Sequence, residues 1–170
     1  MGVLFLVLSL VLYSFLVPQA QGATFVMPET TEIATPQEVS VNFYLLGTNG
    51  YGLVPETQIL SLAPGESLAG KVTETFLAHL ETKGLLPSGL EAAKVYQSSG
   101  KIYVDLPASY RNLPLDIRNE IGLIYGLANS LLALDSVTEV EFLLGGQSGS
   151  ALIHLSLAEP FRAQESSSSS

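Results

Sequence analysis

The first regular pattern along the chain is an alternation of apolar and polar positions in residues 39–45. Its apolar members are Val39, Val41, Phe43 and Leu45. A period of two is typical of a half-buried β-strand, because successive side chains point to opposite faces. The turn-forming segment GTNGYG (47–52) follows, and TQILSL (57–62) has the apolar content of a second strand. The pattern therefore predicts two strands joined by a loop.

Apolar residues recur at helical spacing in two longer segments, about 66–83 and 115–134. These residues are Leu68, Val72, Phe76 and Leu80 in the first segment, and Ile117, Ile121, Ile124, Leu127 or Ala128, and Leu131 in the second. Such a stripe covers one face of an amphipathic helix. Gly84 suits the C-terminal cap of the first helix, and Asp116 suits the N-terminus of the second, where a negative charge is favourable. We expect two helices that bury one face each.

Short strand patterns fill the rest of the folded part. Residues 92–97 and 101–106 flank the turn SSGK and predict a hairpin. The core-facing residues of its second strand are Ile102, Val104 and Leu106. After the second helix, TEVEFLL (138–144) and ALIHLSL (151–157) alternate again, separated by GGQSGS. The predicted order is β-β-α-β-β-α-β-β, an α+β fold in which both amphipathic helices pack on one face of a small mixed sheet.

The N-terminal segment carries no charged side chain before Glu29 and contains an apolar run over residues 3–17. That run is shorter than the roughly 20 residues of a membrane-spanning helix, and small residues at Ala20 and Gly22 suit a signal-peptidase site. We expect an exported, periplasmic or otherwise extracytoplasmic protein, whose leader is cleaved after Gly22 or is kept as a membrane anchor. The predicted division is a leader (1–22), an extended linker (23–38), one folded domain (39–161) and a disordered serine-rich tail (162–170).

Composition narrows the range of partners. The 16 acidic residues against 7 Lys and Arg give a net charge of -9, and no basic cluster offers the positive surface that nucleic acid requires. The chain has no cysteine, which excludes disulfides, thiolate nucleophiles, sulfur-ligated metals and a lipidated cysteine. We therefore expect no nucleic-acid partner, and the sequence indicates no cofactor.

Few reactive side chains occur in patterns that indicate catalysis. Glu139 and Glu141 project to the same side of a strand and could share a proton or hold a hard cation. No third oxygen ligand is near in sequence, so a solvated outer face is the favoured interpretation. Ser148, His154 and Asp105 supply the residue types of a hydrolase triad but without a recognisable spacing, and no short histidine spacing indicates a metal. The sequence predicts no catalytic residue and no metal site.

Several ordered segments resemble one family. KIYVDLPASYRN, IYGLANSLLAL, VTEVEFLLGG and HLSLAEPF, together with a glutamate in the second helix, are similar to the GerMN domain, a sporulation and germination module of exported bacterial proteins. The resemblance covers about residues 41–161. Its motif positions are Asp105, Glu120, Asn129, Ser130, Leu131, Val140, Phe142 and Gly145. The sequence shows a single copy and no lipobox cysteine, so tandem geometry and lipid anchoring are not carried over.

The resemblance implies a non-enzymatic domain, related in fold to ring-building motifs that assemble laterally in cell-envelope complexes. Our leading hypothesis is a scaffold or assembly module in which an exposed sheet edge or helix face contacts copies of the chain or another envelope protein. The alternative is an extracytoplasmic protein that binds a small polar ligand, such as a cell-wall fragment, with the loops GTNGYG and GGQSGS. Under either hypothesis, the membrane is a partner only through the N-terminal segment, and only if that segment stays uncleaved.

Overall fold

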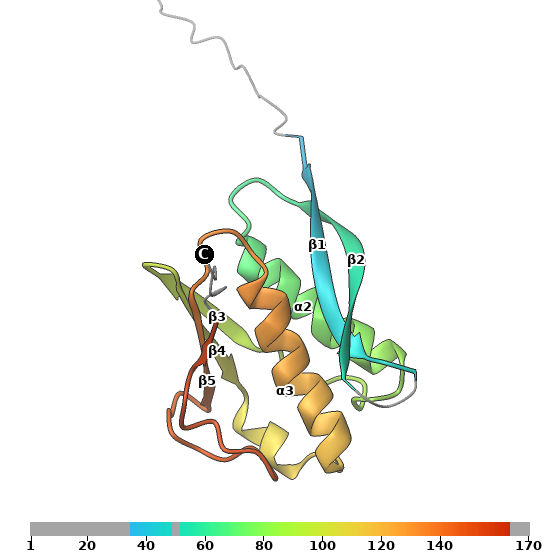
Figure 1. Cartoon of the computed structure of the whole chain (residues 1–170), viewed down its shortest axis with the longest axis vertical. Helices are drawn as coiled ribbons and strands as arrows, with labels where there is room; N and C mark the ends of the chain where they lie inside the picture. The colour runs from blue at the N-terminus through green and yellow to red at the C-terminus, as the bar shows by residue number, and fades with distance from the viewer. Residues whose placement is uncertain (1–34, 49–51, 164–170) are drawn as a thin grey trace, which may run out of the picture. The chain divides into compact units, whose positions relative to one another are not determined.

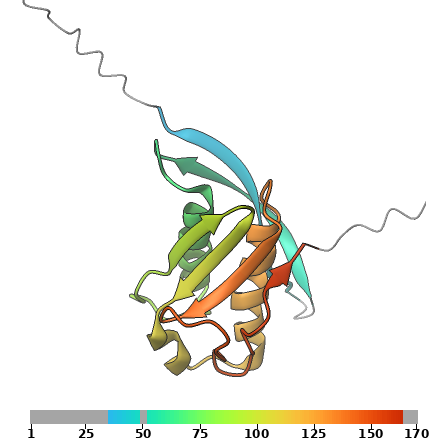
Figure 2. The ribbon, with the colours of Figure 1, turned by 90° about the vertical axis from the view of Figure 1, so that its left-hand side faces the viewer.

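The computed structural model describes residues 35–48 and 52–163, and Figures 1 and 2 show the arrangement of their helices and strands. The predicted leader (1–22) lies outside the described residues, as do most of the linker (23–38) and of the serine-rich tail (162–170). Within the described part, no helix combines the length and the apolar character that crossing a bilayer requires.

The first two strands form a hairpin of their own. β1 (Gln37–Leu46) pairs with β2 (Leu53–Leu62) in an antiparallel, two-stranded sheet. Phe43 and Leu60 are buried on its inner side, whereas Ile59 points outward and is 71% exposed. The pair of strands agrees with the prediction, although the second strand begins at Leu53 and not at the start of TQILSL.

Both predicted helices are present. The Ser67 side chain caps α2 (Leu68–Thr82) by accepting a backbone N–H at 3.3 Å, and Asp116 caps α3 (Ile117–Leu132) in the same way at 2.8 Å. Gly84 follows α2 with a φ of +69°, a conformation that favours glycine and ends the helix. The buried apolar residues include Val72, Phe76 and Leu80 on α2 and Ile124, Leu127 and Leu131 on α3.

The remaining strands form a second sheet. Its members are β3 (Lys94–Ser98), β4 (Lys101–Leu106), β5 (Glu139–Leu144) and β6 (Phe161–Arg162), in the order β3-β4-β5-β6. β4 and β5 run parallel while the other pairs are antiparallel, so the sheet is mixed. A short 3-10 helix, η1 (Ala108–Asn112), leads from β4 toward α3. Phe161 of β6 packs edge-on against Phe142 and Tyr125, with ring centroids 5.6 and 5.0 Å apart.

The helices lie between the two sheets. α2 and α3 cover one face of the four-stranded sheet, as predicted, and Figure 2 shows both helices behind it. The hairpin β1–β2 does not join that sheet, contrary to the prediction of a single sheet. It packs on the other side of the helices, where β1 contacts α3 (Figure 1).

Small residues on α3 explain why it packs against both sheets. A Cβ on Gly126 would lie 2.6 Å from the Tyr44 carbonyl oxygen, and a Cβ on Gly122 would lie 2.7 Å from the Leu46 side chain. The Ser130 hydroxyl accepts the Tyr44 N–H at 2.9 Å and donates to the Gly126 carbonyl at 2.7 Å. These positions recur every four residues, so one side of the helix is flat enough for the β1 backbone to approach closely.

The segment ALIHLSL (151–157) is not the strand that its alternation predicts. Only one isolated bridge, between Ala151 and Ser156, is present there, and the last strand is instead Phe161–Arg162. The physical reason is a competing acceptor, because the backbone N–H groups in the middle of the segment bind the carboxylate of Glu120. Leu152 and Leu157 are buried on either side of this contact.

Candidate functional site

Glu120 has the most unusual surroundings of the predicted motif residues. It belongs to the first turn of α3, and its side chain is completely buried. Oε1 accepts the backbone N–H groups of Ile153, His154 and Leu155 at 2.9, 3.0 and 3.0 Å. Oε2 accepts the N–H of His154 at 2.9 Å and lies 2.7 Å from the Nδ1 atom of the same residue. One carboxylate thus holds three consecutive amides of the C-terminal loop.

Two opposing effects determine the protonation of Glu120. Burial alone raises the pKa of a carboxyl group, because it disfavours the charged form. The bonds from Leu155, Ile153 and His154 outweigh that effect and lower the pKa of Glu120 below its ordinary value of 4.5. The carboxylate is therefore ionised at neutral pH, and Nδ1 of His154 must donate to it, since an ionised carboxylate has no proton to give. This arrangement anchors a loop to a helix.

Asp105 and Gly145 act together where β4 and β5 end. The Asp105 carboxylate accepts the Gly146 N–H at 2.7 Å, and the Gly145 N–H donates to the Leu106 carbonyl at 2.8 Å. Because β4 and β5 are parallel, their C-terminal ends lie side by side, so the last residues of β4 can hold the turn after β5. Gly145 has a φ of +60°, and a Cβ there would lie 3.2 Å from the Cβ of Ala108. The turn therefore needs a glycine.

The other predicted motif residues lie in the core or on α3. Leu131, Val140 and Phe142 are at most 2% exposed and belong to the common apolar core. Asn129 is partly buried, and its Nδ2 donates to the Tyr125 carbonyl at 2.7 Å. The motif residues belong to one folded framework: Asp105 and Gly145 line a common cavity, whereas Leu131, Val140 and Phe142 lie in the core.

The residues weighed for a hydrolase do not form a linked set. His154 binds Glu120, and Asp105 binds the turn after β5. In the described part of the chain, no hydrogen bond joins Ser148 to either of them. Residues 35–48 and 52–163 also contain no group of three His, Asp or Glu side chains that could hold a metal ion.

The described residues of the two loops GTNGYG and GGQSGS line two different cavities. Thr48 of the first loop lines a cavity of about 300 Å³ with Leu45, His79 and Lys83. Gly145 and Gly146 line a separate one beside Asp105.

The face of the four-stranded sheet that points away from the helices carries paired charges. We call this surface the outer face; it consists of Lys94, Tyr96, Ser98, Lys101, Tyr103, Asp105, Glu139, Glu141, Leu143 and Arg162. Lys101 Nζ lies 2.7 Å from both glutamate carboxylates, and Arg162 Nε donates to Glu139 at 3.0 Å. The Lys101 ammonium also lies 4.8 Å from the centre of the Tyr103 ring.

These contacts change the interpretation of the two glutamates. Their side chains are 20% and 19% exposed and are neutralised by Lys101, so they do not form the freely solvated pair that the sequence favoured. The hydrogen bonds that Lys101 donates to both carboxylates raise the pKa of its ammonium. The hydrogen bond from Lys101 and the one from Arg162 lower the pKa of Glu139 despite partial desolvation. The two cations and two carboxylates balance locally, in contrast to the strongly acidic chain.

Comparison with protein families decides the relationship that the motif residues indicate. The family model Germane, described as sporulation and spore germination, matches residues 42–150. The chain belongs to the Germane family. The GerMN resemblance of the sequence is thereby confirmed, and the protein is a sporulation- and germination-related domain of the GerMN type. No curated protein matches the chain.

The solved structures to which this chain is similar include GerMN domains. The first GerMN domain of the sporulation protein GerM from Bacillus subtilis is 21% identical, with a TM-score of 0.45, and the match covers 64% of this chain and 84% of that one. The tandem GerMN domains of the same protein are 19% identical, with a TM-score of 0.49, covering 71% of this chain and 44% of that one. A candidate lipoprotein from Clostridium perfringens is 14% identical, with a TM-score of 0.46, covering 76% and 89%.

Sequence reasoning named Glu120 but missed its partners. The available signal was its position, because Glu120 lies one helical turn before Ile124, on the otherwise apolar stripe of α3. An acid at such a position is buried and needs donors. Tyr110 was missed altogether. It lies in η1 between Pro107 and Pro114, and its side chain is 1% exposed.

Proposed function

We propose that this Germane-family chain is an exported, non-enzymatic assembly module of the cell envelope, and that it contacts copies of itself through the outer face of its four-stranded sheet. The observation that supports the choice of this surface is the exposure of Tyr96 on β3, which is 53% exposed. β3 is the first strand in the sheet order and pairs only with β4 among the described residues. Its other edge can therefore accept a further strand.

The chemistry of the outer face supports association. The centres of protein interfaces are enriched in tyrosine and arginine and depleted in unpaired charge. On this face Tyr96 and Tyr103 lie directly opposite each other, and the charges of Lys101 and Glu141 are already paired. Covering the part of the face around Lys101 therefore leaves none of the charges of Lys101, Glu139, Glu141 and Arg162 without a partner. The net charge of -9 opposes association elsewhere on the surface, which favours a contact at a locally neutral patch.

Export is supported by the sequence of the N-terminal segment, which combines the apolar run 3–17 with small residues at Ala20 and Gly22. In the described residues, the titratable side chains that a hydrolase would use are engaged in holding loops. Envelope proteins other than the chain itself are the second class of partner, and they are expected to use the same surface.

Sedimentation velocity from micromolar to millimolar concentration tests this proposal. We expect the mean mass of the protein to rise with concentration and the rise to be lost in Tyr96→Lys. Ile59→Lys is the matched control, because it places the same charge at an exposed apolar position on the other sheet. A protein that stays monomeric at every concentration, and that crosslinks to no envelope protein, would refute the proposal. Equal effects of both variants would refute the choice of surface.

A further inference from the structure

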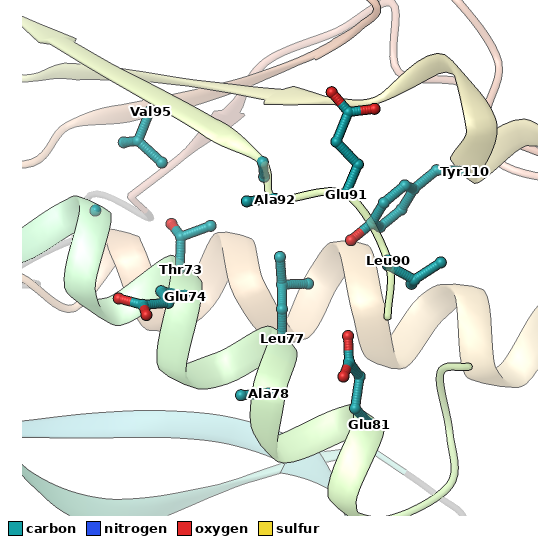
Figure 3. Close-up of a pocket in the computed structure, with 12 residues that line it drawn as sticks. Thr73, Glu74, Leu77, Ala78, Glu81, Leu90, Glu91, Ala92, Val95 and Tyr110 are labelled. Atoms are coloured by element: carbon teal, nitrogen blue, oxygen red, sulfur yellow. The ribbon is translucent and has the colours of Figure 1, made fainter. Parts of the chain in front are cut away.

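A second surface feature lies on the side of α2 that faces β3. Here the chain turns away from α2 at Gly84 and returns along the helix without regular structure before β3 begins. The return leaves a cavity of about 300 Å³ that is open to solvent (Figure 3). Its apolar wall is formed by Leu77 of α2, Leu90 of the returning segment and Val95 of β3. A wall of this kind accommodates an aliphatic chain.

Tyr110 points into this cavity with its hydroxyl group. The residue is 1% exposed, so its ring is enclosed by the core. The hydroxyl makes no hydrogen bond to any of the described residues. Every fully buried side-chain nitrogen or oxygen atom of those residues has a hydrogen-bond partner, so the hydroxyl oxygen is not fully buried. The hydroxyl therefore opens onto the cavity, and Figure 3 shows it turned toward α2 between Leu77 and Leu90. A polar atom placed at the end of an apolar wall requires a polar partner from outside the chain.

The charges around the cavity are all negative. Glu74 and Glu81 project from α2, and Glu91 projects from the returning segment (Figure 3). Glu74 lies 3.5 Å from Lys71, but Glu81 and Glu91 take part in none of the ion pairs of the described residues. Burial raises the pKa of Tyr110, and the charge of Glu81 adds to this effect, so the hydroxyl stays neutral beside the carboxylate of Glu81. Such a cavity repels anions and attracts cations.

We propose that this cavity binds the lysine side chain of a partner protein. The four-carbon stem lies along Leu77, Leu90 and Val95, and the ammonium donates to the carboxylate of Glu81 and to the Tyr110 hydroxyl oxygen, which face each other in Figure 3. A lysine combines an apolar stem with a compact charge, which is the chemistry that the cavity presents. Arginine fits less well, because its guanidinium prefers the face of an aromatic ring or a coplanar carboxylate, and Tyr110 presents its hydroxyl end. The inference does not depend on self-association through the outer face.

The test is a two-dimensional ¹H–¹⁵N NMR titration of the chain with Nα-acetyl-lysine amide. We expect shifts confined to the amides of α2 and of residues 90–95, with a dissociation constant on the order of 1 mM for this single side chain. Glu81→Gln and Tyr110→Phe should each weaken binding by about threefold to tenfold, since the first removes the negative charge that attracts the ammonium and the second removes the hydroxyl that accepts from it. Glu38→Gln, an exposed glutamate on β1, is the matched control and should leave the affinity unchanged.

Two further probes separate the alternatives. Nα-acetyl-norleucine amide keeps the stem and lacks the ammonium, so equal shifts with this probe would show a purely apolar groove and overturn the proposal. Butylammonium supplies the ammonium without a peptide; binding much tighter than that of the capped lysine would assign the site to a free amine and overturn the choice of a partner lysine. No shifts at saturating probe, or an affinity that Glu81→Gln leaves unchanged, would also overturn it.

Discussion

Replacing Glu120 should cost more stability than any other single change of charge in the described part of the chain. The residue is fully buried and accepts three consecutive backbone N–H groups, from Ile153 to Leu155, at 2.9–3.0 Å. Glu120→Ala removes the acceptor and leaves these donors facing a small void. Glu120→Gln keeps the volume and one acceptor oxygen, but its NH₂ group opposes the donors.

The size of the effect follows from the number of bonds. A hydrogen bond to a charged group contributes about 1.5–3 kcal/mol to stability. The three bonds do not add fully, because the loop can move outward and hydrate some of its amides. We therefore expect a loss of about 3–5 kcal/mol for Glu120→Ala and about 2–3 kcal/mol for Glu120→Gln. Small domains have a total stability of about 5–15 kcal/mol, so either loss is large.

The pH dependence supplies a second signature. The pKa of Glu120 is lowered from 4.5 in the folded protein, so the folded state binds this proton more weakly than the unfolded chain. Its contribution is fully present above the unfolded pKa, near 4.5, and is lost as the pH falls through the lower, folded pKa. The stability difference between the wild type and Glu120→Gln should therefore shrink below pH 4.5.

Urea unfolding followed by circular dichroism, repeated from neutral to acidic pH, measures both signatures. Glu159→Gln is the matched control, because Glu159 is an exposed glutamate of the same C-terminal segment and should change stability by less than about 0.5 kcal/mol. A loss for Glu120→Gln as small as that of the control, or a difference that does not vary with pH, would refute the role assigned to this carboxylate.

Three further predictions concern the packing of α3 and the outer face. Gly126→Ala should destabilise the protein by about 1–3 kcal/mol in urea unfolding, because its Cβ would lie 2.6 Å from a β1 carbonyl, whereas Gly70→Ala, whose Cβ would meet nothing closer than 3.5 Å, should be neutral or stabilising. Ser130→Ala should cost about 1–2 kcal/mol and speed hydrogen exchange at the β1 amide that now donates to its hydroxyl at 2.9 Å. Lys101→Gln should raise the pKa of Glu139 toward its ordinary value of 4.5, as followed by NMR of the side-chain carboxyl, and an unchanged pKa would contradict the ion pairing.

Periodicity predicted the helices and most of the strands because local burial determines them. The alternation over 101–106 and 138–144 corresponds to β4 and β5, whose buried residues follow the pleat. Periodicity gave the wrong prediction for 151–157, because the carboxylate of Glu120 on α3 accepts the backbone N–H groups that would otherwise pair with a neighbouring strand. No pattern within the segment reveals such a long-range acceptor.

The separation of the two sheets was also beyond local pattern. It depends on Gly122, Gly126 and Ser130, which let β1 approach α3 from the side opposite the main sheet. In the sequence these residues only weaken the helix, because glycine lowers helix propensity. Their value for packing becomes visible once the partner strand is placed. The cavity beside Tyr110 escaped prediction for a similar reason, since its wall is assembled from three segments that are separate in the sequence.

The most direct test of assembly through the outer face is hydrogen–deuterium exchange, measured by mass spectrometry at low and at high protein concentration. Our account predicts that the amides of β3, from Lys94 to Ser98, exchange more slowly at high concentration, while those of β2, in the other sheet, exchange at the same rate at both concentrations. Exchange in β3 that does not depend on concentration, or protection that arises on β2 instead, would contradict it.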